Sequence, residues 1–132
     1  MDDESGHGFF HWNELLTTDV DKAKDFFSKT VGWTFEDMPM PDGGKYYVAM
    51  SEGEPVGGMM NMPAAVPSGT PPHWLSYLEV EDLEDAASKV KAAGGTVLRE
   101  PFEVPEVGRI AMIADPTGAV LGLIKPAEFG DD

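Results

Sequence analysis

The feature that most constrains the fold is an internal repeat, found when the sequence is compared with itself. The first half aligns with the second so that Asp19 matches Asp82 and, further along, Gly58 matches Gly122. The offset grows by one between these two pairs, which indicates a single insertion in the second copy. Further matching pairs are Val20 with Leu83, Ala23 with Ala86, Phe27 with Val90, Gly32 with Gly95, Gly44 with Gly108, Lys45 with Arg109 and Val56 with Val120. Such a repeat predicts two similar structural modules.

Both copies have the same predicted succession of elements. Residues 9–17 alternate loosely as a strand, and apolar residues then recur every three or four positions across 20–31, which indicates a helix capped by Asp19. The second copy repeats this helical face and ends it at Gly94-Gly95. Each helix is followed by three expected extended segments, at 32–38, 45–50 and 56–62 in copy one and at 95–104, 108–115 and 119–125 in copy two.

These elements predict an α+β protein made of two tandem βαβββ modules. Four strands with one helix leave one sheet face uncovered, so the modules are expected to form a curved mixed sheet around a central cleft, with the helices outside. We expect a single domain over residues 1–132. Module one spans about 8–61, a Pro-rich linker spans 62–72, and module two spans about 73–126.

Composition narrows the classes of function and location. The formal charge of −15 disfavours binding to nucleic acid or to an anionic membrane surface. The absence of cysteine excludes disulfides, thiolate nucleophiles and cysteine-ligated metals. No segment is long and apolar enough to span a membrane, and the first ten residues do not resemble a secretory signal, so a cytoplasmic protein is expected.

Two motifs carry a resemblance to a known family. The stretches TTDVDKAKDFFSKTVGW and DPTGAVLGLIKP resemble the vicinal oxygen chelate superfamily of glyoxalases, bleomycin-resistance proteins and extradiol dioxygenases. More narrowly, PPHWLSYLEVEDLEDA and VGRIAMIADPTGAVLGLIKP look like the glyoxalase-like proteins that include a mycobacterial antigen.

The resemblance implies a divalent metal held by one residue from the first and one from the last strand of each module. Those positions fall on Trp12, Gly58, Leu75 and Gly122, none of which can ligate a metal. We therefore expect no metal and no other cofactor.

Strand alternation sorts the remaining candidate residues by face. His11 lies eight residues before Asp19, whereas His73 lies nine before Asp82, so the two histidines are not equivalent. His11 is expected to face the helix. The residues expected to bind a ligand in the cleft are Trp12, Glu14, Gly58, Met60, Leu75, Tyr77 and Gly122.

Glu14 and His73 are the candidate catalytic residues. A carboxylate beside Trp12 could act as a general base or bind a ligand, and its alternative is a rim carboxylate paired with Lys45 or Arg109. His73 could carry a proton, with a surface or capping role as the alternative.

Three functions stay open at this point. The first is a metal-free small-molecule-binding protein of the bleomycin-resistance kind. The second is an enzyme of the superfamily (a lyase, isomerase, hydrolase or dioxygenase-like protein) using Glu14 with His73 or Tyr77, either without metal or with one bound through departures from the family pattern. The third is a non-catalytic interaction or sensor module. The partner is expected to be a small molecule, and exchange of modules between two copies would give a homodimer.

Overall fold

The computed structural model describes residues 6–40, 44–63, 66–104 and 107–127. The chain divides into two compact units. The first unit consists of residues 12–75, and the second consists of residues 1–11 together with residues 76–132. Residues 64–65 of the predicted linker lie outside the described residues.

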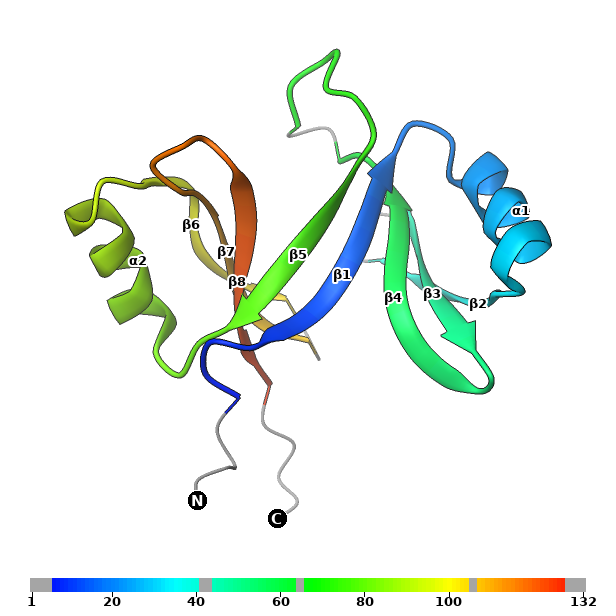
Figure 1. Ribbon diagram of the computed structural model, residues 1–132, viewed down its shortest axis with the longest axis horizontal. Helices are drawn as coiled ribbons and strands as arrows, with labels where there is room; N and C mark the ends of the chain where they lie inside the picture. Colours follow the sequence, from blue (N-terminus) through cyan, green and yellow to red (C-terminus); the bar gives the residue numbers. More distant parts are fainter. Residues whose placement is uncertain (1–5, 41–43, 64–65, 105–106, 128–132) are drawn as a thin grey trace. The chain divides into compact units, whose positions relative to one another are not determined.

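The first half of the chain has the predicted βαβββ order (Figure 1). Its elements are β1 (Phe10–Thr17), α1 (Val20–Val31), β2 (Thr34–Pro39), β3 (Lys45–Ser51) and β4 (Glu54–Asn61). The strands lie in the order β2-β3-β4-β1, with β1 parallel to β4 and the other neighbours antiparallel.

The second half repeats this arrangement. Its elements are β5 (His73–Glu79), α2 (Leu83–Ala92), β6 (Thr96–Val104), β7 (Gly108–Ala114) and β8 (Val120–Pro126). The strand order is β5-β8-β7-β6, with β5 parallel to β8 and the other neighbours antiparallel. The prediction of two tandem βαβββ modules in an α+β protein is therefore confirmed.

The ends of both helices follow from local side-chain chemistry. The Asp19 carboxylate accepts a hydrogen bond from the Lys22 backbone N–H, and Asp82 accepts the equivalent bond from Asp85. Each aspartate satisfies a backbone donor that a helix start leaves without a partner. At the other end of α1, Gly32 adopts a φ of 76°, which glycine reaches without steric cost.

Each helix packs on one face of its own sheet. In the first unit, Leu15, Val20 and Met59 form the buried core between β1, α1 and β4. In the second half, the corresponding core consists of Val80, Leu83, Ala111, Ile113 and Leu123. Because side chains alternate along a strand, the neighbours of these core residues face the side of the sheet that the helix does not cover.

None of the helices in the described part of the chain is long and apolar enough to cross a membrane.

Candidate functional site

The candidate site lies on the face of the first sheet that points away from α1. Glu14 pairs with Gly58 in the parallel β1–β4 ladder, and each precedes a core residue, Leu15 or Met59. Alternation therefore places Glu14 and Gly58 together on the helix-free face, as the sequence predicts. The Glu14 side chain is nevertheless buried, with 9% of the residue exposed.

A chain of hydrogen bonds joins three side chains on this face. The Trp12 indole Nε1–H donates to the Tyr46 hydroxyl oxygen at 2.8 Å, and the Tyr46 hydroxyl donates to Glu14 Oε1 at 3.0 Å. We call these three residues the Trp12–Tyr46–Glu14 network. It connects β1 to β3 across β4 and fixes the carboxylate of Glu14 beside an indole ring.

Burial, and then the nearby charge of Glu14, raise the pKa of Tyr46 above its ordinary value, although the hydrogen bond from Trp12 lowers it. The Tyr46 hydroxyl therefore keeps its proton at neutral pH. It acts as the donor to Glu14 and as the acceptor from Trp12. Both hydrogen bonds of the network therefore run in the same direction, from Trp12 to Tyr46 and from Tyr46 to Glu14.

This raised pKa predicts a loss of stability at alkaline pH. In the unfolded chain, Tyr46 loses its proton near pH 10, because its ordinary pKa is 10.0. In the folded chain, Tyr46 still holds its proton at that pH, because its pKa is raised. Stability is therefore full below that value and falls as the pH rises above it. From about pH 9 to about pH 11, the wild type should lose about 1 kcal/mol more unfolding free energy than Tyr46→Phe.

Urea unfolding at the two pH values measures this difference. Tyr47→Phe is the matched control, because Tyr47 packs against the α1 core on the opposite face and the variant retains Tyr46. It should keep the wild-type pH dependence. Equal pH dependence in the wild type and Tyr46→Phe would contradict the prediction.

Two glycines leave space for tyrosine rings on the helix-free faces. A Cβ added at Gly58 would overlap the Tyr46 hydroxyl and ring, and a Cβ added at Gly122 would overlap the Tyr77 ring. Tyr77 is 7% exposed and pairs with Gly122 in the β5–β8 ladder, as Glu14 pairs with Gly58 in the first unit. The repeat register inferred from the sequence is therefore confirmed.

The residues at the four implied ligand positions do not fit a divalent metal. Trp12, Leu75 and the two glycines offer no oxygen or imidazole ligand. The space that a ligand side chain would need at Gly58 or Gly122 is taken by a phenol ring. Among the described residues, no group of three or more His, Cys, Asp or Glu side chains is arranged to hold a metal ion.

His11 and His73 have local partners. Nδ1 of His73 lies 2.9 Å from the Pro71 carbonyl oxygen, which can only accept, so this nitrogen donates a hydrogen bond within its own loop. Nδ1 of His11 lies 3.4 Å from Glu79 Oε1. The arrangement of His73 agrees with the capping role considered for it and lends no support to a proton-carrying role.

The alternative in which Glu14 is an exposed rim carboxylate paired with Lys45 is wrong, and its pairing with Arg109, which lies in the other unit, stays a prediction. Lys45 Nζ lies 3.6 Å from Asp37 on the neighbouring strand, and Arg109 forms an ion pair with Glu84 on α2. Glu14 is buried and bonded to Tyr46 instead.

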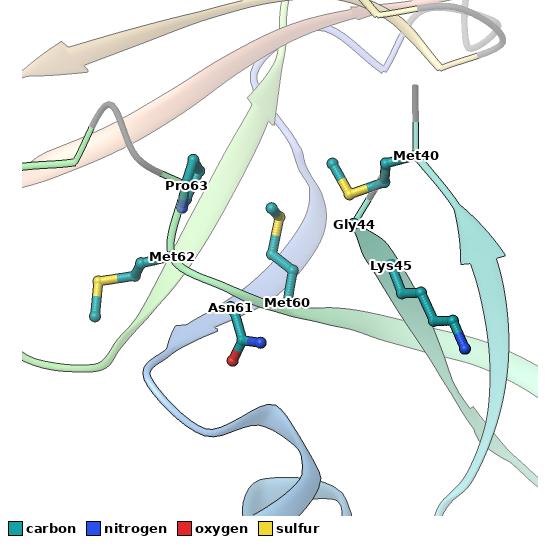
Figure 2. Close-up of a pocket in the computed structure, with 7 residues that line it drawn as sticks. All are labelled: Met40, Gly44, Lys45, Met60, Asn61, Met62 and Pro63. Atoms are coloured by element: carbon teal, nitrogen blue, oxygen red, sulfur yellow. The ribbon is translucent and has the colours of Figure 1, made fainter. Parts of the chain in front are cut away.

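Tyr46 is the functional candidate that the sequence analysis missed. The repeat gives it no signal, because the equivalent position of the second copy holds Ile110. Strand alternation could have found it: Tyr47 packs in the α1 core, so Tyr46 must face the other side, above Gly58. Met60, which was predicted to bind a ligand, shares this face and lines a pocket at the end of β4 (Figure 2).

The chain is similar to a known protein family and to named proteins. The family model described as "Glyoxalase/Bleomycin resistance protein/Dioxygenase superfamily" matches residues 9–123. The Mycobacterium tuberculosis protein named "Putative glyoxylase CFP32" is 40% identical over 121 residues, which cover 91% of this chain and 46% of that protein. The anthracycline biosynthesis protein DnrV of Streptomyces peucetius is 29% identical over 123 residues, covering 85% of this chain and 45% of that protein. The chain thus spans about half the length of these relatives.

A solved structure shares the fold at low sequence identity. The methylmalonyl-CoA epimerase of Mycobacterium tuberculosis superimposes with a TM-score of 0.67 at 17% identity, covering 97% of this chain and 94% of the epimerase. At this identity the likeness concerns the fold alone.

Proposed function

Because this chain belongs to the glyoxalase/bleomycin resistance protein/dioxygenase superfamily, we propose that it binds a small molecule without the divalent metal of that superfamily. The single observation that carries the proposal is the buried Glu14 on the helix-free face, hydrogen-bonded to Tyr46. Keeping a carboxylate buried is costly, so its position on this face makes Glu14 a candidate for recognising a ligand.

The chemistry of the network indicates what the ligand offers. Glu14 is a carboxylate, which accepts hydrogen bonds and carries negative charge, so it suits a hydrogen-bond donor or a cation. The Trp12 indole supplies a flat apolar surface beside it. A planar or apolar molecule carrying an amine, amide or hydroxyl group fits both features.

Metal independence is supported by the residues at the implied ligand positions. Binding would then rest on the protein's own side chains, with Glu14 fixing the polar end of the ligand and Trp12 its flat part. The Tyr46 hydroxyl holds both side chains in place, since it bonds to each of them.

Two measurements on the protein purified without a chelator test this proposal together. Elemental analysis should find well under one nickel, zinc, iron or manganese ion per chain. A thermal-shift screen of small amines and amides should find stabilising compounds whose effect persists in excess EDTA, because ligand binding to the folded state raises its stability. About one metal ion per chain, with ligand stabilisation lost on chelation, would refute the proposal.

A further inference from the structure

Aromatic side chains gather beside α1 in the first unit. In the part of that unit that the structure describes, five rings form a continuous series of contacts, with neighbouring ring centroids 5.0 to 6.5 Å apart. Phe27 contacts three of the others and packs on the buried core between α1 and its sheet. We call the five residues the aromatic patch: Phe26, Phe27, Trp33, Phe35 and Trp74.

Part of the aromatic patch is open to solvent. Phe26 is 57% exposed and Trp74 is 45% exposed. Val31, which lies one turn after Phe27 on α1, is 58% exposed and extends the apolar surface. Adjoining exposed apolar side chains of this size are uncommon on a monomer and mark sites of interaction.

The internal repeat shows that a βαβββ module forms without these rings. The second copy has the same order of elements, so the same positions of the fold can be compared in the two units. There Lys89 stands for Phe26, Val90 for Phe27, Thr96 for Trp33 and Leu98 for Phe35. Because the module does not require aromatic residues at these positions, their exposure in the first unit points to a role in association.

The charges on α1 favour a second copy of this chain as the partner. The formal charge of −15 makes two copies repel each other over most of their surface. The α1 helix instead carries three lysines against two aspartates. Lys29 pairs with Asp25 at 2.9 Å, and Lys24 Nζ lies 3.8 Å from the centroid of the Tyr47 ring. Two copies therefore meet with the least repulsion where their α1 helices face each other.

We propose that two copies of this chain associate through the aromatic patch, with Phe26 and Trp74 at the centre of a twofold interface. Such an interface uses the same surface on both copies, so each patch supplies the apolar surface that the other needs. Since about half of each ring is exposed, Phe26 and Trp74 together bury about 200 Å² per copy. That is about a quarter of what each partner buries in a standard interface, and polar residues around the patch form the rim.

Sedimentation velocity over a range of protein concentrations tests this interface. The wild type should form a dimer reversibly. Phe26→Lys should raise the dissociation constant of the dimer about thirtyfold or more, because an aromatic residue at the centre of an interface contributes strongly to its affinity. The helix should still form in this variant, because the second copy carries a lysine at the equivalent position of α2.

Phe10→Lys is the matched control for this variant. Phe10 is 67% exposed, lies outside the aromatic patch and undergoes the same chemical change. It should associate as the wild type does. A wild type that stays monomeric at every concentration would overturn the proposal, and so would a dimer that is as stable in Phe26→Lys as in Phe10→Lys.

The indole N–H signals of the wild type give a second measurement. On dilution through the range in which the dimer dissociates, the Trp33 and Trp74 signals should shift, because both residues belong to the aromatic patch. The Trp12 signal should stay in place, since Trp12 lies on the helix-free face of the sheet. If dilution shifts the Trp12 signal and leaves Trp33 and Trp74 unchanged, the copies associate through another surface and the proposal is wrong.

Discussion

Replacing Glu14 with glutamine is expected to weaken small-molecule binding by about ten- to a hundredfold. A hydrogen bond to a charged group contributes about 1.5 to 3 kcal/mol, and Glu14→Gln removes the charge while keeping an oxygen in the same place. That oxygen still accepts the bond from Tyr46, so the network and the fold should survive. The loss should therefore appear in affinity rather than in folding.

Isothermal titration with the strongest compound from the thermal-shift screen measures this effect. Glu36→Gln is the matched control, because Glu36 lies exposed on β2 in the same unit and undergoes the same chemical change. It should leave the affinity unchanged. If Glu14→Gln binds as tightly as Glu36→Gln, then Glu14 has no part in recognition and the binding role passes to the aromatic side chains.

Replacing Gly122 with alanine is expected to destabilise the chain by about 1 to 3 kcal/mol, the usual cost of overpacking a closely packed site. The added methyl group would overlap the Tyr77 ring, which is 7% exposed and has little room to move. Because the destabilisation by Gly122→Ala should arise from this one contact, it should be smaller in a variant that lacks the Tyr77 ring.

Chemical denaturation of the wild type and three variants isolates the contact. Gly122→Ala, Tyr77→Ala and the double variant should show a coupling, with Gly122→Ala costing less in the Tyr77→Ala background. Val120→Ala on the same strand is the control, because Val120 is 49% exposed and should change stability by no more than about 0.5 kcal/mol. If Gly122→Ala lowers the free energy of unfolding no more than the control does, then the Tyr77 ring does not require a glycine at position 122.

The fold was predictable from the sequence because the repeat and the strand alternation agree. The repeat aligns Gly58 with Gly122, and the structure pairs these glycines with Glu14 and Tyr77 in equivalent ladders. The face of Glu14 followed from its distance to the helix cap at Asp19. These features depend on local periodicity, which a sequence records directly.

The partners of the site residues were less predictable. Opposite charge suggests Lys45 or Arg109 as the partner of Glu14, but Lys45 pairs with Asp37 in the fold, and Arg109, in the other unit, pairs with Glu84. Tyr46 was missed because it reaches Glu14 across an intervening strand, and its counterpart in the repeat is an isoleucine. Whether two side chains meet across an intervening strand depends on their length and rotamer, and the sequence repeat gives no information on either. The cleft shared by the two modules and the homodimer stay predictions.

The most direct test of a metal-free binding site at the Trp12–Tyr46–Glu14 network is NMR of the indole N–H groups. The chain has three tryptophans, so the spectrum of protein labelled with 15N at the indole nitrogen should be simple, and the Trp12→Phe variant assigns the Trp12 signal. The strongest compound from the thermal-shift screen should shift the Trp12 signal more than the signals of Trp33 and Trp74. The size of the Trp12 shift should be the same with and without EDTA. A Trp12 signal that does not move, or that moves only when a divalent metal is present, would contradict the account.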